Sequence, residues 1–124
     1  MSKFEHPYIE HAEYLEFVVP EEVRDEEAFK ELLQAMVEAT KKTGKRRIFV
    51  DRGQSDKTVR TDPMVIYRMA VRMGEAFGAS VRIAAFSHWA DQDTFWEDVA
   101  TNRGAIVRAS SDRASLLTWL LQED

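Results

Sequence analysis

Four short apolar runs, separated by segments with the spacing of amphipathic helices, restrict the fold of this chain more than any other feature of its sequence. The runs lie at residues 13–19, 47–51, 81–86 and 105–108, and each has the length of a β-strand. Connections of about a dozen residues or more favour right-handed crossovers between parallel strands. The sequence therefore predicts an α/β fold, with a single mixed, mostly parallel sheet of four to five strands and about four helices.

Helix ends are marked by residues that suit them. Asp25 is a predicted N-cap, and Gly44 is placed to end the helix that follows it. Asp62 before Pro63 predicts the start of a second helix, which should end near Gly78. Two shorter helices are expected later in the chain. The candidates for their N-caps are Asp91 or Asp93 for the third helix and Ser110 or Ser111 for the last.

The length of 124 residues suits one domain with its own hydrophobic core. We assign residues 13–122 to a single domain. Residues 1–12 form an N-terminal segment that is either mobile or the site of a first strand at Tyr8 and Ile9. No internal repeat or interdomain linker interrupts the pattern.

Several function classes are excluded by what the sequence lacks. Without cysteine there is no disulfide, no thiolate nucleophile and no Cys-ligated metal. Neither common glycine-rich phosphate motif occurs, since residues 52–55 contain one glycine only. The start of the sequence has no continuous apolar run, so no signal or transit peptide is expected. No apolar stretch approaches the roughly 20 residues of a membrane span. A cytoplasmic location follows as the expectation.

Charge is distributed unevenly along the chain. Residues 1–40 carry 3 basic and 11 acidic side chains, residues 41–82 carry 11 and 4, and residues 83–124 carry 3 and 7. The basic cluster between Lys41 and Arg47 could mark a nucleic-acid surface. Its first lysines also suit the last turn of a helix, and the net charge of -5 would repel phosphates. We therefore predict no nucleic-acid partner.

Ligand sites of open α/β sheets gather at the carboxyl ends of the strands, here residues 51–60, 87–93 and 109–112. Two kinds of site are conceivable there besides a binding surface. His88, Asp91 and Asp93 could ligate a divalent metal, but the two aspartates equally suit a helix cap, so no metal or cofactor is predicted. An enzyme built from these loops would draw on Asp51, Arg52, Arg60, His88 and Asp91.

The start of the second helix is a candidate anion site. Its first backbone N–H groups lack helical partners, and Arg52 and Arg60 lie nearby in the sequence. This end could bind an anion or carry a phosphorylated hydroxyl at Thr61 or Ser55. The alternative is that the residues before the helix only cap it.

The second helix also has an unusually broad apolar face. Met64, Tyr67 and Val71 widen its core stripe, which indicates either deep burial or a partner surface. Arginine and tyrosine are common anchors at interfaces. The candidate partner-binding residues are therefore Arg52, Arg60, Tyr67, Arg68 and Arg72.

The order of elements, the run 47–51 followed by a polar loop and a helix, and the ending at residues 111–120 together resemble the STAS domain superfamily. Its bacterial members include small SpoIIAA-like anti-sigma-factor antagonists. The resemblance implies a mixed sheet with helices largely on one side, and a regulatory role without catalysis. In the antagonists a partner kinase phosphorylates a serine at the start of a helix. The corresponding stretch here is 58–64, where Arg60 replaces an acidic residue and Thr61 supplies the one hydroxyl of the helix start.

The sequence thus predicts a non-enzymatic binding or regulatory domain that contacts a protein partner or a second copy of itself. Two alternatives stay open. One is a protein that binds a small or lipid-like ligand between helix and sheet, in a methionine-rich pocket. The other is an enzyme whose site lies in the loops at the carboxyl ends of the strands.

Overall fold

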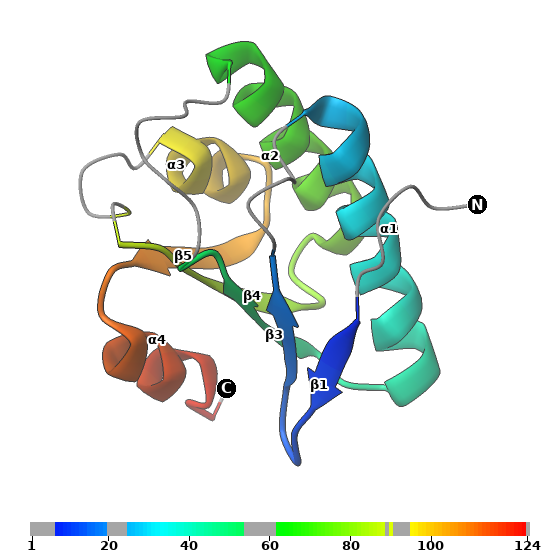
Figure 1. Ribbon diagram of the computed structural model, residues 1–124, viewed down its shortest axis with the longest axis vertical. Helices are drawn as coiled ribbons and strands as arrows, with labels where there is room; N and C mark the ends of the chain where they lie inside the picture. The colour runs from blue at the N-terminus through cyan, green and yellow to red at the C-terminus, as the bar shows by residue number, and fades with distance from the viewer. Residues whose placement is uncertain (1–6, 20–24, 54–61, 89, 91–94, 124) are drawn as a thin grey trace.

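A computed structural model describes residues 7–19, 25–53, 62–88, 90 and 95–123 (Figure 1). The α/β prediction is confirmed: four helices and a five-stranded mixed sheet make up the described fold. In chain order the elements are β1 (Tyr8–Glu10), β2 (Leu15–Val18), α1 (Glu26–Thr43), β3 (Arg47–Asp51), α2 (Pro63–Phe77), β4 (Arg82–Phe86), α3 (Phe95–Asn102), β5 (Ile106–Ser110) and α4 (Arg113–Leu120).

The strands lie in the sheet in the order in which they occur in the chain. β1 is antiparallel to β2, and β2 to β5 are parallel to one another. The first strand expected at Tyr8 and Ile9 is therefore present. Successive right-handed crossovers in one direction place α1, α2 and α3 on the same face of the sheet. Figure 1 shows α4 on the opposite side of the sheet.

Strand alternation divides the core between these two faces. Ile48, Val50 and Ile83 point toward α1, α2 and α3 and belong to the larger hydrophobic cluster. Phe49 and Ala84, which directly follow Ile48 and Ile83, point the other way and pack beneath α4. The buried leucines of α4 that cover them are Leu116 and Leu120.

The predicted ends of the first two helices are confirmed. An Asp25 carboxylate oxygen accepts a hydrogen bond from the Ala28 N–H at 2.8 Å. Gly44 ends α1 in the left-handed conformation, with φ of 74°. At α2, Asp62 accepts from the Met64 N–H at 2.8 Å and Pro63 opens the helix.

The predicted cap of α4 was wrong. Ser110 belongs to β5, where it pairs with Phe86 of β4, because the strand continues two residues beyond the predicted end. Asp112 is the N-cap instead, and its Oδ1 accepts a hydrogen bond from the Ser115 N–H at 3.1 Å. For α3, the candidate caps Asp91 and Asp93 lie outside the described residues.

Helices α2 and α3 approach each other closely at a glycine. A Cβ added to Gly74 would lie 2.7 Å from both the Cβ and the carbonyl oxygen of Arg103. The absence of a side chain at Gly74 therefore allows this contact. Across the part of the chain that the structure describes, no helix combines the length and hydrophobicity needed to cross a membrane.

Candidate functional site

The carboxyl ends of β3, β4 and β5 meet at one edge of the sheet, where the candidate residues lie. The backbone there is fixed by hydrogen bonds from the Val19 N–H to the Asp51 carbonyl at 2.9 Å and from the Arg52 N–H to the Phe86 carbonyl at 2.8 Å. Since side chains alternate along an extended backbone, the neighbours Asp51 and Arg52 are directed to opposite faces. Their environments differ accordingly.

On the α4 face, Asp51 belongs to a closed charge cluster. Arg113, the first residue of α4, donates Nη1 to Asp51 Oδ2 at 2.8 Å and Nη2 to Glu16 Oε2 at 2.9 Å. The second carboxylate oxygen of Glu16 lies 2.9 Å from His11 Nε2. Arg113 also stacks over the Phe49 ring, with its Cζ 4.6 Å from the centroid.

This cluster holds α4 against the sheet. Burial opposes the charge of Arg113, but its hydrogen bonds to Asp51 and Glu16 outweigh burial and raise its pKa. Glu16 is only 8% exposed, so Arg113 compensates a carboxylate that would otherwise be buried without a cation. Arg113 bonds both carboxylates of the cluster, which suits a structural role.

The candidate enzyme residues Asp51 and His88 are described at this edge, whereas Arg60 and Asp91 lie outside the described residues. Asp51 Oδ1 accepts the Gly53 N–H at 2.8 Å, and Oδ2 accepts Arg113, so both oxygens are engaged. His88 is exposed and lies edge-on to Phe86, with ring centroids 5.2 Å apart. Among the described residues no hydrogen bond joins His88 to Asp51, and no three His, Asp or Glu residues form a group that could hold a metal.

Arg52 lies on the face of α1 and α2, and its environment differs from that of Asp51. Its guanidinium Cζ lies 5.1 Å from the centroid of the Phe29 ring in α1. Its Nε is buried and has no hydrogen-bond acceptor within the residues that the structure describes. Burial lowers the pKa of Arg52 to about 10, so the group stays protonated at neutral pH. Arg52 is thus a partly buried cation whose Nε has no acceptor among the described residues.

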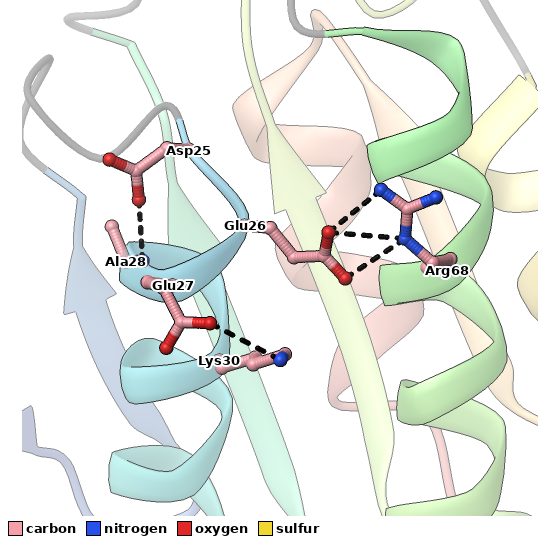
Figure 2. A network of polar contacts seen from close by, with 6 residues as sticks. All are labelled: Asp25, Glu26, Glu27, Ala28, Lys30 and Arg68. Atoms are coloured by element: carbon pink, nitrogen blue, oxygen red, sulfur yellow. Dashed lines mark hydrogen bonds and ion pairs between the residues drawn. The ribbon is translucent and has the colours of Figure 1, made fainter.

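Near Arg52 in the fold, the start of α1 carries a carboxylate that is bound by another arginine. Glu26 lies one turn before Phe29 on the same side of α1. Its Oε2 accepts Arg68 Nε at 2.9 Å and its Oε1 accepts Arg68 Nη2 at 2.7 Å, as Figure 2 shows. This hydrogen bonding lowers the pKa of Glu26. The pair joins the start of α1 to α2.

Most other predicted binding residues of α2 are also engaged within the chain. The Tyr67 hydroxyl accepts a hydrogen bond from Arg103 Nη2 at 2.7 Å, and Arg68 is bound to Glu26. Arg72 is exposed, as is Met64. The remaining predicted residues, Ser55, Arg60 and Thr61, lie outside the described part of the chain.

Sequence reasoning missed the charge cluster around Arg113. Its signal was Glu16, a carboxylate in the middle of an otherwise buried strand, since such a group needs a partner from elsewhere in the fold. The sequence could not show which cation would reach it, because Arg113 is 97 residues away.

No protein-family model matches the chain, and no curated protein matches it either. The resemblance to the STAS superfamily stays a prediction.

Proposed function

We propose that this protein is a non-enzymatic binding domain whose partner presents a carboxylate or phosphate group to Arg52 at the carboxyl edge of the sheet. The observation that carries the proposal is the buried Nε of Arg52, which has no acceptor among the described residues. Folding a charged group into a poorly hydrated site without a partner is costly. A bound anion would remove that cost.

The chemistry of Arg52 supports an oxyanion as the group recognised. A guanidinium presents planar, forked N–H donors that match the two oxygens of a carboxylate or phosphate. The Phe29 ring against its face leaves the edge of the guanidinium as the direction from which an acceptor can approach. The place, at the carboxyl ends of parallel strands, is where open α/β sheets usually bind ligands.

The cluster of Glu16, Asp51 and Arg113 supports a binding role without catalysis. Its carboxylates are engaged with Arg113 and with neighbouring groups of the chain, which leaves neither Asp51 nor Glu16 free to act as a general base. In the finer form of the proposal the domain is a STAS-like regulatory protein of the bacterial cytoplasm, and its partner is another protein. A free small anion is the alternative ligand.

Thermal unfolding in the presence of anions tests the proposal. A probe with a Kd of about 1 mM that binds the folded state stabilises it by about 1.8 kcal/mol at 20 mM. We expect acetate and inorganic phosphate, each compared with chloride at equal ionic strength, to raise the unfolding temperature of the wild type. R52M should lose this increase, whereas R72M, which removes an exposed arginine, should keep it. Equal increases in R52M and the wild type would refute a site at Arg52.

A second candidate is association through the outer face of α2. Met64 is 55% exposed and lies in one row with Arg68 and Arg72, spaced by four residues each. An exposed methionine flanked by arginines suits a protein contact, including one with a second copy of the chain. Sedimentation velocity of M64E against the wild type tests this: a homodimer that dissociates in the variant supports it, and identical sedimentation contradicts it.

A further inference from the structure

We infer that the opposite, amino edge of the sheet carries a second binding site, which accepts a small phosphorylated molecule. A cavity of about 470 Å³ opens there, between the turns that precede the parallel strands. Its walls come from the turn between β1 and β2, the turn between α1 and β3, and the turn between α2 and β4. The lining residues central to the inference are Thr43, Lys45, Arg46, Arg47, Ser80 and Arg82.

The cavity is strongly basic. Lys45, Arg46, Arg47 and Arg82 line it, against the one acidic lining residue Glu13. All four cations belong to the segment between residues 41 and 82, whose positive charge exceeds its negative charge by seven. The fold gathers this charge because β3 and β4 are parallel neighbours, so Arg47 and Arg82 begin adjacent strands and are paired in register.

Backbone carbonyl groups hold two of these arginines in place. Arg47 donates Nη2 to the Gln122 carbonyl oxygen at 2.9 Å. Arg82 donates Nη1 to the same oxygen at 2.7 Å and to the Trp119 and Leu120 carbonyls at 3.2 Å each. These bonds fix the guanidinium groups beside the carbonyl end of α4, where cations are favoured. A backbone carbonyl carries only a partial charge, so Arg47 keeps its full positive charge.

Lys45 and Arg46, the other two cations of the cavity, are held by fewer contacts. Arg46 is exposed, and no side-chain hydrogen bond or ion pair of Arg46 is found within the described residues. Lys45 faces Glu10 at 3.5 Å, and a partly exposed pair at that distance contributes little. Arg46 is therefore free to close on a ligand, while Arg47 is already in place.

The class of ligand follows from charge and size. Several cations around one cavity favour a group with more than one negative charge and several acceptor oxygens, as a phosphate has. The volume lies within the range of small-molecule sites, which leaves room for the rest of a small molecule beside its phosphate.

Amide NMR with sodium pyrophosphate as the probe tests the inference at constant ionic strength. We expect saturable shifts of the amide signals of Gly44, Lys45 and Ser80. R46Q should raise the Kd at least about three-fold, as expected for the loss of one exposed charge contact. The matched control R108Q removes an exposed arginine of β5 and should leave the Kd within about two-fold of the wild type.

Three results would overturn the inference. One is an equal Kd in R46Q and the wild type. Another is a set of shifts confined to Arg52 and its neighbours, abolished by R52M, which would place pyrophosphate at the carboxyl edge alone. The third is tighter binding of a single-stranded oligonucleotide than of pyrophosphate, with the same shifts, which would make nucleic acid the ligand.

Discussion

Replacing Arg52 by methionine should stabilise the folded protein. Methionine keeps an unbranched side chain of similar reach against Phe29 but removes the buried guanidinium. Most substitutions of partly buried residues destabilise, so a gain of stability would be a distinctive result. The expectation follows directly from the unsatisfied Nε of Arg52.

The magnitude can be worked from the pKa of Arg52. An arginine ordinarily has a pKa above 12, whereas burial lowers that of Arg52 to about 10. One pKa unit corresponds to about 1.36 kcal/mol, so the buried charge costs up to about 3 kcal/mol at neutral pH. The substitution also removes the stacking of Arg52 on Phe29, and this loss lowers the stability by about 0.5–1 kcal/mol. Imperfect packing of the methionine side chain lowers the gain further, so we expect R52M to raise the free energy of unfolding by about 1–2 kcal/mol.

Urea unfolding in a chloride buffer without carboxylate or phosphate measures this gain, because added anions would occupy the proposed site. A gain of about 1–2 kcal/mol raises the unfolding temperature by roughly 3–8 °C in a domain of this size. R72M is the control and should change stability by less than about 0.5 kcal/mol, because Arg72 is exposed. Destabilisation of R52M by about 1 kcal/mol or more would mean that Arg52 is satisfied within the fold, and would refute the reasoning.

Three further predictions concern the scaffold. R113M leaves the nearly buried Glu16 without its cation and should lower the free energy of unfolding by about 1–3 kcal/mol in urea titrations; an unchanged value would mean that the charge cluster is not stabilising. G74A places a Cβ 2.7 Å from Arg103 and should cost about 1–3 kcal/mol by calorimetry, unless the helices separate freely. Hydrogen bonding by Ser115 lowers the pKa of Asp112, so its contribution to stability is present near neutral pH and is lost as pH falls through about 4 and below. D112N should therefore lose less stability than the wild type between pH 6 and pH 3, and parallel losses would contradict this.

Helix ends and central strands could be predicted because their signals are local. Asp25 caps the start of α1 with a side-chain oxygen, and Gly44 ends the helix with a positive φ that glycine adopts readily. Strand β3 was predicted with its observed bounds, Arg47–Asp51, because its apolar run is bracketed by charge. The end of β5 was missed since Ala109 and Ser110 are polar or small, and only pairing with β4 extends the strand through them.

The candidate site depends on contacts that no local pattern encodes. Arg52 was a candidate from its position after β3, but the burial of its Nε without an acceptor among the described residues depends on how α1 packs over the sheet. The same limit applies to Tyr67, whose hydroxyl is engaged by Arg103 of a later turn. Sequence position could predict the edge at which the site lies, whereas the charge balance there required the fold.

The side-chain N–H of Arg52 offers the most direct test of the central claim, that this group awaits an external anion. Its Nε–H signal can be assigned in arginine-selective NMR spectra as the one missing in R52M. We predict a signal protected from solvent exchange that shifts saturably with acetate or phosphate, while the Arg72 signal follows ionic strength alone. An Arg52 signal that responds to neither anion, or no more than that of Arg72, would contradict the account.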